Sequence, residues 1–147
     1  MTEERVLVKV IGAYRFKDES GTEWIYILLE DEAKQRMPIY VDQCAAWAVM
    51  QGLEDSRESK TQERPLAYEA MLACLLAAGA VIEEAYIKDV RNELFYAQLT
   101  LRVGDQVHLV EILPSDAINL AIRAKCPLLI NGKISKFLVE RQKASIK

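Results

Sequence analysis

Apolar and polar residues alternate along several segments of the chain, and this period of two predicts β-strands. The same segments are rich in branched and aromatic residues, which pack well on a pleated sheet. The predicted strands cover residues 6–11, 24–29, 37–41, 81–90, 94–103, 106–112 and 127–130. Turn-forming residues separate the first two strands and the fourth from the fifth, so the pattern predicts two hairpins.

Apolar residues at helical spacing, bounded by end signals, predict four helices. They cover residues 43–51, residues 65–78, the segment that follows Ser115, and residues 133–143. Asp42 is a preferred N-cap for the first helix, and Gly52 stands where that helix is expected to stop. The polar stretch 53–63 is expected to be a surface loop.

The second predicted helix is apolar on almost every side. Its apolar residues are Leu66, Ala67, Ala70, Met71, Leu72, Ala73, Cys74, Leu75, Leu76, Ala77 and Ala78. Such a helix must be enclosed, either by a sheet that wraps around it or by a second subunit. Because Trp24 and Trp47 add further apolar surface to a small domain, we expect a homodimer.

The order strand, strand, strand, helix occurs twice along the chain. Residues 41–42 lead into the first of these helices much as residues 113–115 lead into the second. The sequence therefore predicts an α+β fold in which a duplicated unit forms one barrel-like, mostly antiparallel sheet with packed helices. We expect a single domain over 1–147, with its core at about 6–135 and a terminal helix or tail over 136–147.

The bulk composition is that of a folded, water-soluble chain. The 147 residues are 51% hydrophobic and 28% charged, which excludes a disordered protein. No apolar run approaches the roughly 20 residues that span a bilayer, so no membrane association is expected. The first residues are acidic and lack the apolar segment of a secretory signal, which favours a cytoplasmic location.

The formal net charge of −3 and an isoelectric point near 5.3 argue against a dedicated high-affinity nucleic-acid binder. A transient nucleic-acid substrate would need only a local basic patch. Basic residues gather near the C-terminus, at Lys133, Lys136, Arg141, Lys143 and Lys147. We interpret them as the solvated side of the final helix.

Cysteine and histidine give little support to a metal site or a cysteine nucleophile. Cys44, Cys74 and Cys126 lie in apolar neighbourhoods and have no metal-ligand spacing, so they are expected to be buried thiols. The chain has one histidine, His108. By strand alternation its side chain points away from Glu111, so we expect a surface histidine and no histidine-dependent mechanism.

Residues 113–117 read Leu-Pro-Ser-Asp-Ala and open an apolar helix that ends in arginine. This segment resembles the Arg-Pro-Ser-Asp-Ala signature of bifunctional nuclease domains. Residues 37–41 are similar to the Leu-Pro-Ile-Trp-Ile strand of that family, residues 64–66 to its Arg-Pro-Leu, and residues 86–97 to its central hairpin. The resemblance runs from about residue 6 to residue 135, which is nearly the whole chain.

Several positions that are polar in the family differ in this chain. Leu113 replaces the arginine of the signature, and Ala45 stands where the family usually has glutamate. The family's Thr-His-Asp becomes Ala-Tyr-Glu at residues 67–69. Glu111, on the strand before the signature, replaces an aspartate.

The resemblance implies a nuclease that hydrolyses phosphodiester bonds of DNA or RNA, with Mg²⁺ or Mn²⁺ as the metal. The implied catalytic residues are Asp116, Glu111, Glu69 and Arg123, and the implied substrate-binding residues are Ser115 and Arg64. Glu111 and Asp116 are five residues apart across a tight junction, so their carboxylates are expected to face one cleft. No spacing in the sequence identifies a metal-ligand set.

Three of these residues also have a structural interpretation. Asp116 is favoured at the positive end of a helix dipole, and Arg123 at the negative end. Glu111 is also explained as an exposed or ion-paired strand residue. The alternative function is therefore a non-catalytic oligomeric interaction module that retains the fold but has lost site residues.

Overall fold

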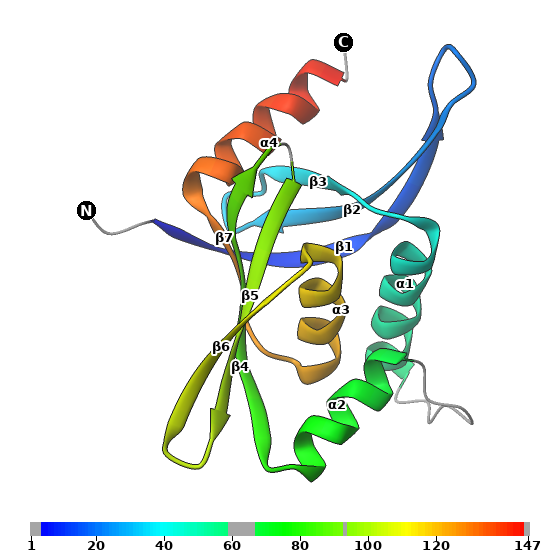
Figure 1. Ribbon diagram of the computed structural model, residues 1–147. Helices are drawn as coiled ribbons and strands as arrows, with labels where there is room; N and C mark the ends of the chain where they lie inside the picture. Colours follow the sequence, from blue (N-terminus) through cyan, green and yellow to red (C-terminus); the bar gives the residue numbers. More distant parts are fainter. Residues whose placement is uncertain (1–3, 59–66, 93, 146–147) are drawn as a thin grey trace.

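The computed structural model describes residues 4–58, 67–92 and 94–145, which form one seven-stranded sheet and four helices (Figure 1). The strands are β1 (Arg5–Lys17), β2 (Glu23–Asp31), β3 (Arg36–Tyr40), β4 (Ala80–Arg91), β5 (Leu94–Val103), β6 (Gln106–Ile112) and β7 (Leu128–Asn131). The helices are α1 (Gln43–Glu58), α2 (Ala67–Ala77), α3 (Pro114–Ala124) and α4 (Gly132–Ser145). The fold is therefore α+β, as the sequence predicts.

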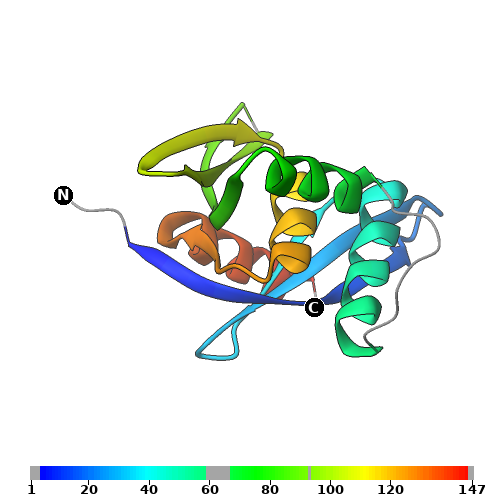
Figure 2. The ribbon, with the colours of Figure 1, turned by 90° about the horizontal axis from the view of Figure 1, so that it is seen from below.

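The sheet has the strand order β3-β2-β1-β7-β4-β5-β6. All neighbouring strands are antiparallel except β4 and β7, which are parallel. Strands β3 and β6 are the two edges and do not pair with each other among the described strands, so the predicted barrel-like closure is wrong. The physical reason is that α3 occupies the middle of the curved sheet, with α1 on one side and α4 on the other (Figures 1 and 2).

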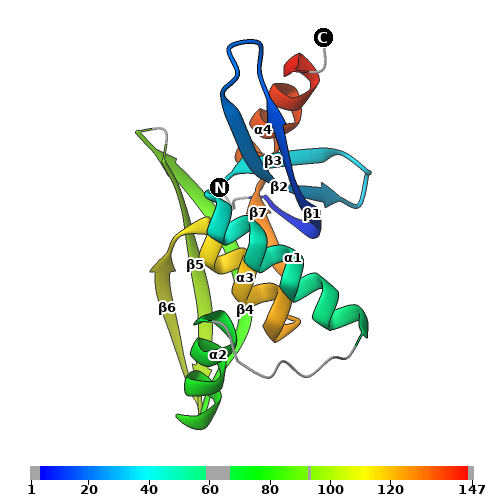
Figure 3. The same ribbon diagram turned by 90° about the vertical axis from the view of Figure 1, so that its right-hand side faces the viewer.

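The repeated order of elements is confirmed. Strands β1, β2 and β3 lead into α1, and strands β4, β5 and β6 lead into α3. The third strand of each group is an edge of the sheet, so the two groups occupy equivalent places. Helices α1 and α3 pack against each other on one side of the sheet (Figure 3).

Helix α1 begins as the sequence predicts, because the backbone N–H of Ala45 donates to Oδ1 of Asp42 over 2.7 Å. Its predicted end at Gly52 is wrong, since the helix continues to Glu58. Gly52 serves a close contact instead of a stop: a Cβ atom there would lie 2.8 Å from Nη1 of Arg123. The predicted loop over 53–63 therefore starts later, and its residues 59–63 lie outside the described ranges.

Helix α3 begins two residues earlier than predicted. Leu113 is the N-cap residue and makes no side-chain cap hydrogen bond, so the prediction of Ser115 as N-cap is wrong. Pro114 sets the start, because its fixed φ suits the first helical position, where an N–H group is not needed. Asp116 still lies in the first turn, and Arg123 in the last.

Among the described residues, one apolar cluster forms the core between the helices and the inner face of the sheet. Helix α3 contributes a continuous buried stretch from Ala117 to Ala121. Strand β2 contributes Ile27 and Leu29, and Ile39 of β3 joins them. Here the inner face is the one that carries these three side chains, and the outer face is the opposite one.

Helix α2 lies at the lower end of the domain in Figure 1, and none of its residues is buried. Met71 is 44% exposed and Leu76 is 55% exposed. Enclosure of this helix by its own sheet, one of the two predicted outcomes, is therefore wrong, because the sheet curves around α3 instead. Pro65 and the rest of the predicted helix start lie outside the described residues.

Two smaller predictions have opposite outcomes. Cys44 and Cys74 are exposed, so the prediction of buried thiols is wrong for these two, while Cys126 is half-buried. His108 lies on β6 and is exposed, as predicted.

None of the helices in the described part of the chain has the length and apolar content needed to cross a bilayer.

Candidate functional site

The beginnings of α1 and α2 meet one side of α3 and bring polar side chains together. This three-helix cluster consists of Asp42, Tyr68, Glu69, Asp116, Asn119 and Arg123. It lies on the side of the sheet that α1 and α3 cover (Figure 3). Four of the six side chains are carried by the first turns of a helix or by its N-cap residue, where helix dipoles favour negative charge.

Tyr68 and Asp116 are joined by a hydrogen bond between α2 and α3. The Tyr68 hydroxyl donates to Oδ1 of Asp116 over 2.8 Å, and both side chains are half-buried. Burial raises the pKa of the Tyr68 hydroxyl, and the hydrogen bond to Asp116 and the charge of Asp42 act in the same direction. Tyr68 is therefore a neutral donor that fixes one oxygen of the Asp116 carboxylate.

Arg123 ties the three helices together. Its side chain is only 6% exposed, and Nη2 donates to the Ala48 carbonyl of α1 over 2.9 Å. Nη1 donates to both the carbonyl and Oδ1 of Asn119, each over 3.1 Å. Nε lies 2.9 Å from Oε1 of Glu69 on α2.

The pair of Glu69 and Arg123 is an ion pair without hydrogen-bond alignment. Within the described residues, Nε of Arg123 and both Glu69 carboxylate oxygens are buried and make no hydrogen bond. The charge of Arg123 is thus neutralised by a carboxylate and enclosed by helix carbonyls. This arrangement suits a residue that positions α2 against α3 better than one that meets a phosphate directly.

Three members of the cluster, Asp42, Tyr68 and Asn119, were not among the site residues predicted from the sequence. Asn119 is the most buried of the three. It is fully buried, and Nδ2 donates to the carbonyls of Ser115 over 2.9 Å and Ala45 over 3.3 Å. The signal in the sequence was an amide between the buried apolar residues Ile118 and Leu120, since a buried polar side chain needs partners. Asn119 links the first turn of α3 to α1.

Glu111 does not join this cluster. Its Oε1 accepts a hydrogen bond from Arg91 over 3.0 Å, and its Oε2 lies 3.8 Å from Nζ of Lys88. Glu111 is paired with Gln98 of β5, next to Leu99, whose side chain enters the core from the inner face. Glu111 therefore points to the outer face, and the structure does not bring its carboxylate together with that of Asp116.

Of the two implied substrate-binding residues, the structure describes only Ser115. Ser115 lies beside Asp116 in the first turn of α3 and is half-buried. Arg64 lies outside the described residues.

The donor atoms of the cluster do not match a metal site. No three histidine, cysteine or acidic residues in the described ranges group in a way that would hold a metal ion. Glu69 is paired with Arg123, and Oδ1 of Asp42 accepts the N–H of Ala45. Mg²⁺ prefers six oxygen ligands in octahedral geometry, and the described residues of the cluster do not fit that requirement.

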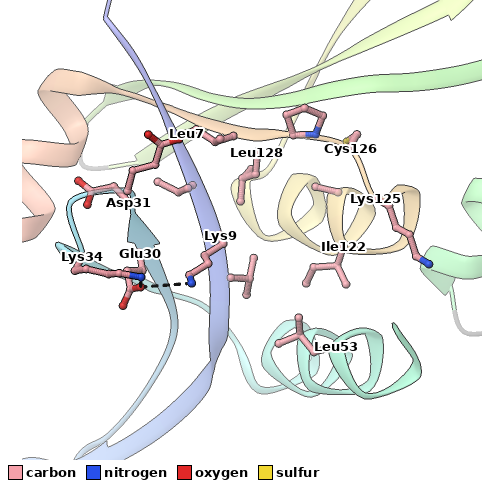
Figure 4. Close-up of a pocket in the computed structure, with 15 residues that line it drawn as sticks. Leu7, Lys9, Glu30, Asp31, Lys34, Leu53, Ile122, Lys125, Cys126 and Leu128 are labelled. Atoms are coloured by element: carbon pink, nitrogen blue, oxygen red, sulfur yellow. Dashed lines mark ion pairs between the residues drawn. The ribbon is translucent and has the colours of Figure 1, made fainter. Parts of the chain in front are cut away.

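A groove of about 660 Å³ lies elsewhere, between β1, the turn after β2 and the end of α3 (Figure 4). It is lined mainly by apolar side chains, including Leu53 and Ile122, and contains no member of the three-helix cluster. Lys9 and Lys34 stand together in it, each 3.7 Å from Oε1 of the buried Glu30. The groove is therefore apolar along most of its length and charged on one side.

Residues 26–141 match the family model of the bifunctional nuclease domain. This match covers most of the chain and every residue of the three-helix cluster. The chain belongs to the bifunctional nuclease domain family.

The curated relatives are plant proteins. The chain is 25% identical over 124 residues to "Bifunctional nuclease 1" of Oryza sativa, in both the indica and the japonica subspecies. It has the same identity to "Bifunctional nuclease" of Oryza minuta. The alignments cover 82% of this chain but 36% of each relative, so the chain spans about a third of the length of these proteins.

Proposed function

We propose that this protein is a nuclease that hydrolyses phosphodiester bonds of DNA or RNA at the three-helix cluster. Family membership over residues 26–141 supports the reaction class. The hydrogen bond from Tyr68 to Asp116 carries the choice of site, because it leaves one oxygen of a half-buried carboxylate oriented and unblocked by Tyr68. A carboxylate held in this way is suited to general base catalysis.

In the proposed reaction Asp116 accepts a proton from a water molecule. The water oxygen bonds to phosphorus, the bond from phosphorus to the leaving sugar oxygen breaks, and solvent supplies the proton for that oxygen. Tyr68 keeps the carboxylate in place throughout, because its hydroxyl stays protonated. Arg123 acts as a positioning residue that holds α2 and α3 at the distance this contact needs.

The test is a cleavage assay on purified protein with labelled single-stranded DNA, duplex DNA and RNA, in Mg²⁺, in Mn²⁺ and in EDTA. Asp116→Asn should lower the cleavage rate by roughly 100-fold or more, because the amide cannot accept the proton. Asp105→Asn is the matched control, since Asp105 is an exposed carboxylate in the turn between β5 and β6. Equal cleavage by wild-type protein and Asp116→Asn would contradict the proposal.

A second candidate function is the non-catalytic oligomeric module, and one observation favours it. Apolar side chains are exposed on α2, where Met71 is 44% exposed and Leu76 is 55% exposed. This helix lies at the lower end of the domain in Figure 1. We therefore propose that a second copy of the chain covers this surface, which is compatible with either candidate function.

A further inference from the structure

Five aromatic side chains gather on the outer face of β1, β2 and β3. This aromatic face consists of Tyr14, Phe16, Trp24, Tyr26 and Tyr40. The strand register places Tyr14, Tyr26 and Tyr40 in one row and Phe16 opposite Trp24 in the next. Neighbouring ring centroids are 5.6 to 6.1 Å apart, and the rings are tilted or edge-to-face.

Three of the five rings are exposed to solvent, and Tyr26 and Tyr40 are half-buried. Tyr14 is 45% exposed, and Phe16 and Trp24 are each 42% exposed. The far end of the β1–β2 hairpin projects beyond the helices (Figures 1 and 3). Cross-strand aromatic pairs stabilise a hairpin, but the core of this domain lies on the opposite face, so the rings are not needed to build it.

The Trp24 indole is held in a fixed orientation. Its Nε1 donates to Oδ2 of Asp18 over 2.9 Å. Oδ1 of Asp18 accepts the backbone N–H groups of Ser20 and Thr22 over 3.0 and 2.9 Å, which closes the turn after β1. An exposed tryptophan that is tethered in this way loses little freedom when a flat ligand stacks on it.

Positive charge borders the aromatic face on two sides. The Arg141 guanidinium of α4 lies 5.2 Å from the centroid of the Tyr40 ring. At the other end of the same outer face, Arg36 pairs with Glu30 over 3.2 Å, and Lys9 and Lys34 lie near the same carboxylate. Three exposed cations share this one carboxylate.

The cations and the rings are aligned along the strands. On β3, Arg36 and Tyr40 point to the same face because they are four residues apart, which corresponds to roughly 13 Å. The same alternation on β2 puts Glu30, Tyr26 and Trp24 on that face. A ligand that lies along these strands therefore meets flat rings at one end and positive charge at the other.

We propose that this outer face binds single-stranded nucleic acid, with bases stacked on the aromatic face and phosphates at Arg141 and at the cations around Glu30. The inference rests on the nuclease function proposed above, for which it supplies the substrate class. Stacking on aromatic side chains is available only to unpaired bases, and nearby cations hold the backbone. A duplex hides its bases and would use the cations alone.

The aromatic face is connected with the candidate catalytic site through the chain itself. Tyr40 ends β3, and Asp42 follows two residues later as the N-cap of α1 in the three-helix cluster. A strand bound across Tyr40 thus leads toward the beginning of α1. The face would orient a single strand before its backbone reaches Asp116.

The experiment uses the fluorescence of Trp24 to report stacking. The chain has two tryptophans, Trp24 and Trp47, so replacing Trp47 leaves the signal of Trp24 alone. In Trp47→Phe, a single-stranded oligodeoxythymidylate should quench the fluorescence of Trp24 by stacking. Anisotropy of a labelled strand in EDTA then gives the affinity. Trp24→Ala and Trp24→Leu should each weaken binding by about fivefold or more. A fivefold loss corresponds to about 1 kcal/mol, the lower end of the range for loss of one stacked base.

The matched control is Trp47→Ala, since Trp47 is 54% exposed on α1, outside the aromatic face. This change should leave the affinity within about twofold. Arg141→Gln should reduce the dependence of binding on salt, by about 0.7 in the slope of log K against log salt for each phosphate that the variant no longer neutralises. Duplex of the same length should bind more weakly than the single strand.

Three results would overturn the inference: equal loss of affinity in Trp24→Ala and Trp47→Ala, no quenching of Trp24 by the single strand, or tighter binding of the duplex. A Trp24 variant that changes the oligomeric state but not the affinity would assign the face to a second copy of the chain. Because binding is measured in EDTA, cleavage without binding at Trp24 refutes this inference alone, and binding without cleavage refutes the proposed nuclease alone.

Discussion

At the scale of single residues, the contact between Tyr68 and Asp116 is the one on which both stability and the proposed chemistry depend. Tyr68→Phe removes the hydroxyl that donates to Asp116. We expect a loss of about 1 kcal/mol in the free energy of unfolding, the usual net contribution of one hydrogen bond. Cleavage should fall as well, because the carboxylate is no longer oriented.

The raised pKa of Tyr68 gives this prediction a pH dependence. Its contribution to stability is fully present below the unfolded-state value of about 10 and is lost as pH rises through the higher folded-state pKa. Wild-type protein should therefore lose more stability above about pH 10 than Tyr68→Phe does. Urea unfolding on both sides of that pH measures the difference, and parallel losses in the two proteins would contradict it.

For Asp18 we expect the opposite pH dependence of stability, with a loss at low pH. Hydrogen bonds from Trp24 and Ser20 lower the pKa of its carboxyl to about 2. Its contribution is present above the unfolded-state value of about 3.9 and is lost as pH falls toward about 2. Asp18→Asn should therefore lose less stability than wild type over this interval. Thermal unfolding monitored through Trp24 fluorescence measures this difference. If Asp18→Asn and wild type lost equal stability at low pH, the hydrogen bond between Trp24 and Asp18 would be contradicted.

Whether a site residue could be predicted from the sequence depends on whether its position is set by local signals or by distant partners. The position of Asp116 in the first turn of α3 was predictable, because local signals set where a helix starts to within a residue or two. Asn119 was not, because its partners at Ala45 and Ser115 become neighbours only after α1 packs on α3. The same holds for Glu111, whose ion pair with Arg91 depends on the pairing of three strands.

At the scale of elements, Gly52 shows how tertiary contact overrides a local signal. Gly52→Ala places a Cβ atom 2.8 Å from Nη1 of Arg123, which is held by Asn119 and by the Ala48 carbonyl. Alanine gains about 1 kcal/mol in helix propensity, but overpacking costs about 1–3 kcal/mol. We expect a net loss on the order of 1 kcal/mol in urea unfolding.

The control for Gly52→Ala is Glu54→Ala, an exposed position on the same helix. It should change the free energy of unfolding by at most about 0.5 kcal/mol. If Gly52→Ala proved more stable than wild type, the close approach of α1 to Arg123 would not be real.

Strands β5 and β6 were the elements that the sequence predicted best, since their bounds match the predicted 94–103 and 106–112. The turn between β5 and β6 carries Gly104 at φ +62°, a left-handed conformation that glycine adopts without strain. The end of α2 likewise carries Gly79 at φ +86°. Element ends that depend on a distant partner, such as the continuation of α1 past Gly52, could not be read from local signals.

At the scale of the whole molecule, the duplicated order of elements was predictable and the closure of the sheet was not. Two groups of three strands follow from alternation and turns along the chain. The place of β7 between β1 and β4 depends on a pairing of segments that are far apart in sequence. Whether β3 then meets β6 is decided by the volume of α3 inside the curve, which no local pattern encodes.

The exposed apolar surface of α2 leads to the last prediction, a homodimer that covers it. Leu76→Glu should shift the protein toward monomer, because a charge at a 55% exposed leucine costs little in the monomer but is unfavourable in an apolar interface. Leu94→Glu is the matched control at a leucine that is 62% exposed at the start of β5. Light scattering across micromolar concentrations measures the mass of each variant. Wild-type protein that stays monomeric, or equal dissociation by both variants, would show that α2 remains exposed to water or that another surface makes the dimer.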